Sequence, residues 1–222
     1  MSKHLIIGTA AIFCCASTGV GTANAQTWLY TGTDYGTGSN WSTGVTPGAA
    51  QTATFNSAGS NQPVVGGNFT IGTVNMTAGS LMINSMRTLT VQSAFNLTNA
   101  SILGNGALSL GTGSVLTVVG SSPVLIAATI AGTGTGAVAI SGSDVTYTGA
   151  NTYSGTTTIG AGRQLSLGNG GTTGTLGSGS VTNNGQLLFN RSNALVVTNV
   201  ISGSGAVTQA GTGTTSLVGA NT

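Results

Sequence analysis

Apolar residues recur two positions apart along most of this chain, in short segments with glycine or asparagine usually between them. Residues two apart lie on the same face of a β-strand, so each pair predicts a short strand with one apolar face and one face of threonine, serine or asparagine. Over much of residues 81–116, successive pairs begin about six to nine residues apart. The pairs are Phe69/Ile71, Leu81/Ile83, Leu89/Val91, Phe95/Leu97, Leu108/Leu110, Leu116/Val118, Val138/Ile140, Leu165/Leu167, Leu187/Phe189 and Leu195/Val197.

This spacing distinguishes between two all-β architectures. A sandwich normally has strands about 8–12 residues apart that are joined by hairpin turns. Shorter strands with one apolar face and many glycine or asparagine corners fit a chain that coils and stacks on itself. The predicted fold class is therefore all-β, a parallel β-helix (β-solenoid) whose repeats occupy residues 68–222.

An internal repeat supports a stacked coil. The segment at positions 148–152 returns almost unchanged at positions 218–222. At about 20–25 residues per turn of a parallel β-helix, one such unit would cover roughly three turns. Two further blocks precede each copy in the same order: residues 130–134 and 136–138 before the first copy, and residues 201–205 and 205–207 before the second.

The region before the repeats, residues 26–67, has a different composition. Trp28, Tyr30, Tyr35 and Trp41 fall close together, and two of the three prolines follow. A solenoid needs an atypical terminal unit to cover the open end of its core, and large aromatic side chains suit that task. We therefore expect an aromatic-rich N-terminal cap; an exposed aromatic platform for a ligand is the alternative.

The first residues, 1–25, resemble a secretory signal peptide. A short positive start at Lys3 is followed by an apolar run over residues 5–16 and by the small-x-small cleavage site at residues 23–25. Cleavage after Ala25 would leave Gln26 as the new N-terminus. The alternative is an uncleaved anchor, but the apolar run is shorter than the roughly 20 residues that span a bilayer.

Charge is nearly absent after residue 25, where only Arg87, Arg163, Arg191, Asp34 and Asp144 remain. So few basic residues exclude a nucleic-acid footprint and a polybasic membrane patch. Both cysteines lie within the predicted leader, which excludes disulfides and thiolate metal sites after cleavage. Disorder requires low hydrophobicity together with high net charge, and this composition has neither.

The same inventory argues against catalysis. General acid–base chemistry needs paired titratable groups, but residues 26–222 contain no His, Cys, Lys or Glu. Asp34 and Asp144 lie far apart in sequence, so several turns should separate them, and we expect Asp144 to hydrogen-bond its own corner. We predict no catalytic residue, no cofactor-binding residue and no metal ligand. A polysaccharide-acting β-helix enzyme ranks last among the functions considered.

One segment also carries a family resemblance. Residues 148–159, continuing through Gly162 to residues 165–168, resemble the autotransporter-associated β-strand repeat of bacterial autotransporter passenger domains. The resemblance extends well over residues 130–222 and more loosely over residues 40–55. One departure is the extra residue at Arg163–Gln164, where we expect a bulge or a longer corner.

The resemblance implies a right-handed parallel β-helix that is exported and then passes through an outer-membrane β-barrel. It implies no catalytic residues. That barrel translocator is an expected partner that is absent from this chain, and we therefore expect the chain to be a truncated piece of a longer protein. Because the last turn would present unpaired strand edges, we also expect the chain to associate through its C-terminal end.

Taken together, the sequence predicts a structural passenger, a β-helical stalk on the cell surface or released from it. It would be periplasmic if the translocator were truly missing. The alternative is an adhesin or self-aggregation module whose uncharged threonine and asparagine faces bind glycans or copies of the same chain. Neither function involves a nucleic acid or a small-molecule cofactor.

Overall fold

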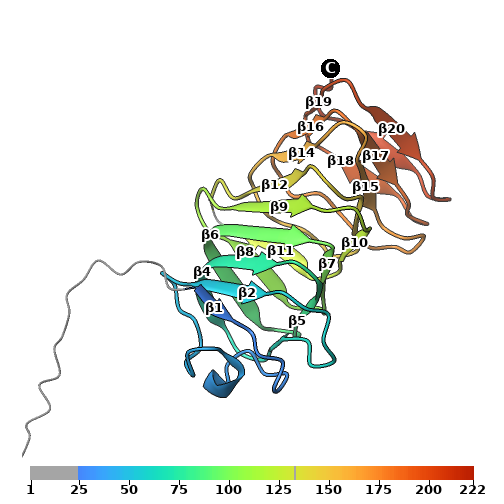
Figure 1. Ribbon diagram of the computed structural model, residues 1–222. Coiled ribbons are helices and arrows are strands. Elements are labelled where there is room, and N and C mark those ends of the chain that lie inside the picture. Colours follow the sequence, from blue (N-terminus) through green and yellow to red (C-terminus); the bar gives the residue numbers. More distant parts are fainter. Residues whose placement is uncertain (1–24, 133) are drawn as a thin grey trace, which may run out of the picture.

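The structure, a computed structural model, describes residues 25–132 and 134–222. The predicted signal peptide therefore lies outside the described residues, except for Ala25. The described chain winds into a stack of parallel strands, with the earliest strands at the bottom of Figure 1 and the C-terminus at the top. Among the described residues, the assigned helix is a short 3₁₀ turn, Gly38–Asn40 (η1).

The strands lie on three sides of the stack. The long sheet follows the path β1 (Ala25–Thr27), β2 (Thr52–Phe55), β4 (Phe69–Met76), β6 (Thr88–Thr98), β9 (Val115–Val119), β12 (Ala137–Ile140), β14 (Thr157–Ile159), β16 (Val181–Asn183) and β19 (Ile201–Ser202). The second sheet contains β3 (Val64–Val65), β5 (Gly79–Ile83), β7 (Ala100–Leu103), β10 (Val124–Ile126), β13 (Val145–Tyr147), β15 (Gln164–Leu167), β17 (Gln186–Phe189) and β20 (Ala206–Gln209).

The third side follows the second sheet in each coil and precedes the next strand of the long sheet. The long strands β4 and β6 begin on this side, and a register shift after Ile71 lets the ladder continue into the long sheet. The separate strands of the third side are β8 (Ala107–Leu110), β11 (Thr129–Gly132), β18 (Leu195–Val197) and β21 (Thr215–Leu217).

The register stacks inward side chains above one another, coil after coil, although the coils differ in length. The coil from Val138 to its ladder partner Thr157 is shorter than the next one, from Thr157 to Val181. Inward positions still form one continuous buried column, because every coil places its alternate residues inside. In the long sheet the column reads Ala53, Val74, Phe95, Leu116, Val138, Thr157, Val181 and Ile201.

The predicted fold class is confirmed. All ten apolar pairs fall in parallel strands, and within them only Phe69 and Leu195 are partly rather than fully buried. At Arg163, where a bulge or a longer corner was expected, the chain makes an ordinary turn: the Arg163 N–H donates to the Gly160 carbonyl (3.1 Å), as the Ser114 N–H does to the Gly111 carbonyl (3.0 Å), and β15 pairs without a register shift. Gly162 makes that turn possible because its φ of +70° lies in the left-handed region.

The two copies of the internal repeat lie on different sides of the stack. Three coils after Val138, the long sheet reaches Ile201, but the repeat equivalent of Val138 is Val207 in the second sheet. Likewise, residues 145–147 lie in the second sheet, and their equivalents, residues 215–217, lie on the third side. The expected unit of roughly three turns is therefore three turns plus one side.

An aromatic cluster covers the N-terminal end of the core. Trp41 packs edge-on against both Trp28 and Tyr35, with ring centroids 5.1 Å apart in each pair. The ring of Phe55 in β2 lies 5.5 Å from that of Trp41, and this contact joins the cluster to the first coils. The two indole N–H groups donate to the carbonyls of Asn61 (3.0 Å) and Tyr35 (2.9 Å), so the buried rings leave no indole donor unpaired. The predicted aromatic-rich cap is present.

Candidate binding surfaces

The two carboxylates are both used by the fold. Asp34 Oδ2 accepts a hydrogen bond from the Thr37 hydroxyl (2.7 Å), and this bond holds the turn before η1. Asp144 Oδ1 accepts from the backbone N–H of Gln164 in the next coil (2.9 Å). The expectation that Asp144 bonds its own corner is therefore wrong, because the neighbouring coil offers a strand N–H directly above it. Each carboxylate has a structural partner.

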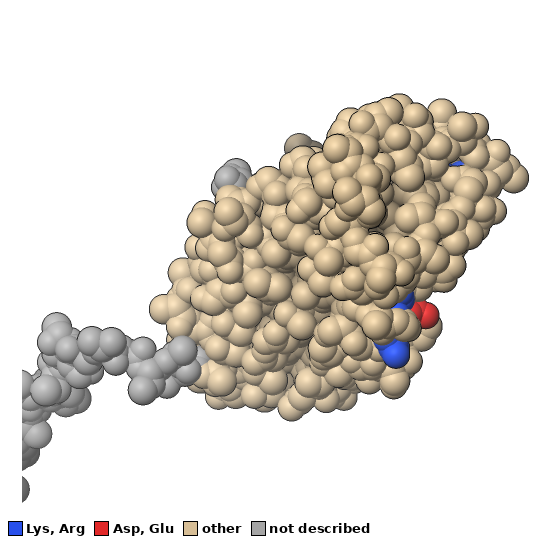
Figure 2. Space-filling model, turned by 90° about the horizontal axis from the view of Figure 1, so that it is seen from above, with Lys and Arg blue, Asp and Glu red and all other residues tan. Residues whose placement is uncertain are grey.

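Two of the three arginines bind backbone carbonyls. Arg191 is buried, and its two terminal nitrogens donate to the carbonyls of Gly174 and Thr172, both at 2.6 Å. These bonds fasten the long third-side segment between β15 and β16 to the coil above. Arg163 donates to the Gly142 carbonyl (2.6 Å). Most of the face in Figure 2 is uncharged, and the acidic side chain visible there lies beside basic ones.

The described residues contain no group of three or more acidic, His or Cys side chains that could hold a metal ion. In the same part of the chain, no helix is long and apolar enough to cross a membrane. The aromatic residues form no exposed platform either: Trp28, Tyr35 and Trp41 are buried, and Tyr30 is half-buried, with its hydroxyl donating to the Ser57 carbonyl (2.6 Å). The alternative function considered for the aromatic region therefore lacks an accessible surface.

Three tyrosines are buried in the core, and burial raises the pKa of each phenol. For Tyr35, burial alone accounts for the raised pKa. The pKa of Tyr147 is raised well above its ordinary value, first by burial and then by the neighbouring Tyr153. The pKa of Tyr153 is raised by burial, although its hydrogen bond to Thr157 (2.7 Å) acts in the opposite direction. Within residues 25–132 and 134–222, the hydroxyls of Tyr35 and Tyr147 find no hydrogen-bond partner.

The outer face of the long sheet is a flat, uncharged ladder, which we call the Thr/Asn face. Its side chains are mostly half-buried, and strand pairing places them one above another at the roughly 4.8 Å spacing of neighbouring strands. On this face, the Asn96 amide donates to Asn75 Oδ1 (2.8 Å). Such a ladder offers donors and acceptors to a neutral partner but no acid or base. Its members are Thr54, Asn75, Asn96, Thr117, Ala139, Thr158, Thr182 and Ser202.

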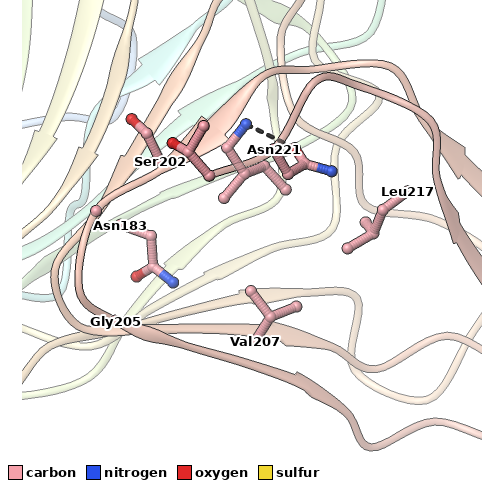
Figure 3. A pocket seen from close by; sticks show the side chains of 9 residues that line it. Asn183, Ser202, Gly205, Val207, Leu217 and Asn221 are labelled. Atoms are coloured by element: carbon pink, nitrogen blue, oxygen red, sulfur yellow. Dashed lines mark hydrogen bonds between the residues drawn. The ribbon is translucent and has the colours of Figure 1, made fainter.

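A second surface lies at the C-terminal end of the stack, where Figure 3 looks onto the last described coil. A hollow of about 210 Å³ opens there between Ile201, Val207 and Leu217. Asn221 lies at its edge, and its Oδ1 accepts from the Ile201 N–H (2.8 Å). We call this surface the end face; it also includes the upper edges of β19, β20 and β21. It exposes apolar side chains that the other coils keep inside.

Asparagine side chains are the functional residues that the alternating pattern did not reveal. The Asn151 side chain links the coil below it to the coil above it. Its Oδ1 accepts from the Ile130 N–H, and its Nδ2 donates to the Thr175 carbonyl, both at 2.8 Å. Asn199 likewise donates to the Gly177 carbonyl (2.8 Å). The recurrence of Asn151 as Asn221 was a usable signal, because a repeated polar residue at a corner indicates a repeated hydrogen bond.

Comparison with known proteins gives a partial match. The chain is 43% identical over 83 residues, 36% of its length, to a curated protein of Brucella suis biovar 1 (strain 1330) named "Adhesin BmaC autotransporter". The matched region spans about 2% of the length of that relative. No family model matches the chain, and no solved structure matches it. The chain is therefore related over part of its length to an autotransporter adhesin.

Proposed function

We propose that this chain is part of the passenger of an exported cell-surface protein and serves there as a rigid β-solenoid spacer. The observation that carries this proposal is the unbroken buried column from Ala53 to Ile201, which makes successive coils a single rod. The partial similarity to an autotransporter adhesin supports the surface location. The proposed partner is an outer-membrane β-barrel translocator, and the proposed repeat type is the autotransporter-associated β-strand repeat.

A spacer has no chemistry of its own, and the described residues fit that role. Their carboxylates and two of their arginines are bound within the fold, and the rings of Trp28, Tyr35 and Trp41 are buried. Each coil adds the roughly 4.8 Å that separates neighbouring strands. In this proposal the functional property of the chain is the length of the rod, and no binding pocket is needed.

Removal of one whole coil tests the spacer. Deletion of residues 75–95 joins Val74 to Asn96, and Val74 then takes the place of its ladder partner Phe95. We expect this variant to keep its β-sheet circular dichroism and its cooperative melting. When it is displayed on cells, an N-terminal epitope should remain accessible. A matched deletion of residues 75–85 removes about half a coil and should abolish folding. Equal damage by both deletions would contradict the proposal.

A second candidate, adhesion, is supported by the Thr/Asn face and by the name of the relative. A flat uncharged ladder could bind a neutral glycan or the same face of another copy. The test compares Thr117→Lys with Thr182→Lys on this face against Thr146→Lys with Thr208→Lys on the outer side of the second sheet. Cell aggregation or glycan binding that only the first pair of substitutions abolishes would establish adhesion and replace the spacer proposal.

A further inference from the structure

A shallow hollow of about 440 Å³ lies on the side of the rod, at the corner where the long sheet leads into the second sheet. The corners of four successive coils line it, at residues 144, 162–164, 184–186 and 204–206. Asp144, Arg163 and Asn184 each have one coil below them and another above them. The hollow, which we call the corner hollow, is therefore a feature of the flank of the rod.

The corner hollow holds two of the five charged side chains of residues 26–222, and the two have opposite signs. Asp144 Oδ1 accepts from the Gln164 N–H (2.9 Å), and Arg163 Nη1 donates to the Gly142 carbonyl (2.6 Å). Backbone groups, rather than the opposite charge, thus hold each side chain. In the part of the chain that the structure describes, Asp144 Oδ2 and Arg163 Nη2 have no hydrogen-bond partner, so both charges can still bind an outside group.

The composition of the corner hollow makes it complementary to itself. Asp144 is exposed, whereas Arg163 is half-buried, so the carboxylate of a second copy can enter the hollow and reach the guanidinium. The amides of Gln164, Asn184 and Gln186 line the same hollow, and amides can both donate and accept between like surfaces. No aromatic ring is among the lining residues, so a sugar ring would find no face on which to stack.

We propose that the corner hollow is the contact through which two copies of this chain pair side by side, with Asp144 of each copy against Arg163 of the other. Such a contact uses the same patch on both copies and is built around a two-fold axis. The pairing goes beyond the spacer role, because it would join neighbouring rods, and it does not involve the Thr/Asn face.

The direction of the paired rods follows from the position of the two charges. Arg163 binds the carbonyl of Gly142, two residues before Asp144, so the charges lie side by side along one coil rather than one above the other. A two-fold axis parallel to the rod then sets opposite charges face to face, whereas an axis across the rod would set like charges together. The two rods therefore point the same way, as neighbours on one cell surface would.

Pairing of this kind should be weak and sensitive to salt. Exposed ion pairs contribute little each, and salt screens them. Neighbouring copies anchored on one surface nevertheless meet at a high effective concentration, so a weak contact is sufficient to join them.

Charge reversal tests the proposal. Asp144→Arg leaves two basic side chains in the hollow, and Arg163→Asp leaves two acidic ones. Each variant alone should associate at least about tenfold more weakly than the parent chain at low salt, because like charges then meet. An equal mixture of the two should regain the parent's association, since every contact is again between opposite charges. Sedimentation velocity measures all three, and Arg87→Asp at a different corner is the matched control that should change nothing.

Two further measurements separate pairing from folding. Asp144→Asn keeps an oxygen for the Gln164 N–H but removes the charge, so it should weaken association without lowering the melting temperature. A label attached at Ser60→Cys, near the N-terminal end, should lie close to its counterpart in each pair of parallel rods. If a reversal variant does not melt cooperatively, Asp144→Asn and Arg163→Gln decide instead. The proposal is overturned if the parent chain stays monomeric at low salt, if the mixture associates no better than its components, or if neither neutral variant weakens association.

Discussion

Alkaline pH should unfold this protein through its buried tyrosines. Burial raises the pKa of Tyr35, Tyr147 and Tyr153 above the ordinary value of 10.0. Above pH 10 the unfolded chain therefore holds fewer protons than the folded chain, and the free energy of unfolding falls as the pH rises. Each phenol contributes about 1.4 kcal/mol per pH unit, so three together contribute about 4 kcal/mol per unit.

This slope is large compared with the stability of an ordinary domain, about 5–15 kcal/mol. A protein with about 8 kcal/mol would reach its midpoint about two units above the ordinary tyrosine pKa. The composition makes the measurement clean, because residues 26–222 contain no lysine or cysteine that would titrate in the same range.

The assay follows tyrosinate absorbance and far-ultraviolet circular dichroism together during an alkaline titration. The three buried phenols should ionise in the same cooperative step that removes the β-sheet signal. Tyr147→Phe should reduce the slope of stability against pH by about one third. If all the tyrosines ionise smoothly near pH 10 while the β-sheet signal persists, the burial argument is refuted.

The other predictions concern the fold and its processing. Tyr35→Phe should raise the free energy of unfolding by about 1 kcal/mol at neutral pH, because it removes a buried hydroxyl that has no hydrogen-bond partner among the described residues. Tyr153→Phe should lower the free energy of unfolding, because the Thr157 hydroxyl loses its partner. Urea denaturation measures both effects. Arg191→Met should destabilise the chain by about 2–4 kcal/mol by leaving two carbonyls unpaired, and Arg191→Lys should not restore the loss, as thermal melting would show. N-terminal sequencing of exported protein should begin at Gln26, and a start at Met1 would contradict the signal-peptide prediction.

The sequence predicted the strands well because alternation is a local property. Leu116 and Val118, for example, identify β9 without any knowledge of its neighbours. The polar core positions could not be found in this way. Thr157 lies in the buried column between Val138 and Val181, and Asn183 is buried in the next strand, although both residues look like outward positions. Whether these two side chains point inward or outward depends on the register of their strands, and the lengths of the corners determine that register.

The candidate surfaces were predicted only in part. An uncharged threonine and asparagine face follows from composition and period, and the structure places Thr54, Asn75 and Asn96 on one ladder. The upward bonds of Asn151 could not be predicted, since they depend on which residue of the next coil lies above. That choice varies with coil length, which differs between the two successive coils that meet at Thr157.

The mismatch between repeat length and coil length bears on the choice between spacer and adhesin. A repeat of a whole number of coils would place the same outward residues on the same side every time, as an adhesive face requires. Here the segment around Val138 lies in the long sheet and its equivalent around Val207 lies in the second sheet. The repeat therefore spreads its outward residues around the rod while it keeps the inward ones apolar, because every side needs an apolar interior. The repeat therefore keeps the core apolar but does not return the same outward residues to the same side of the rod. This arrangement supports the spacer proposal.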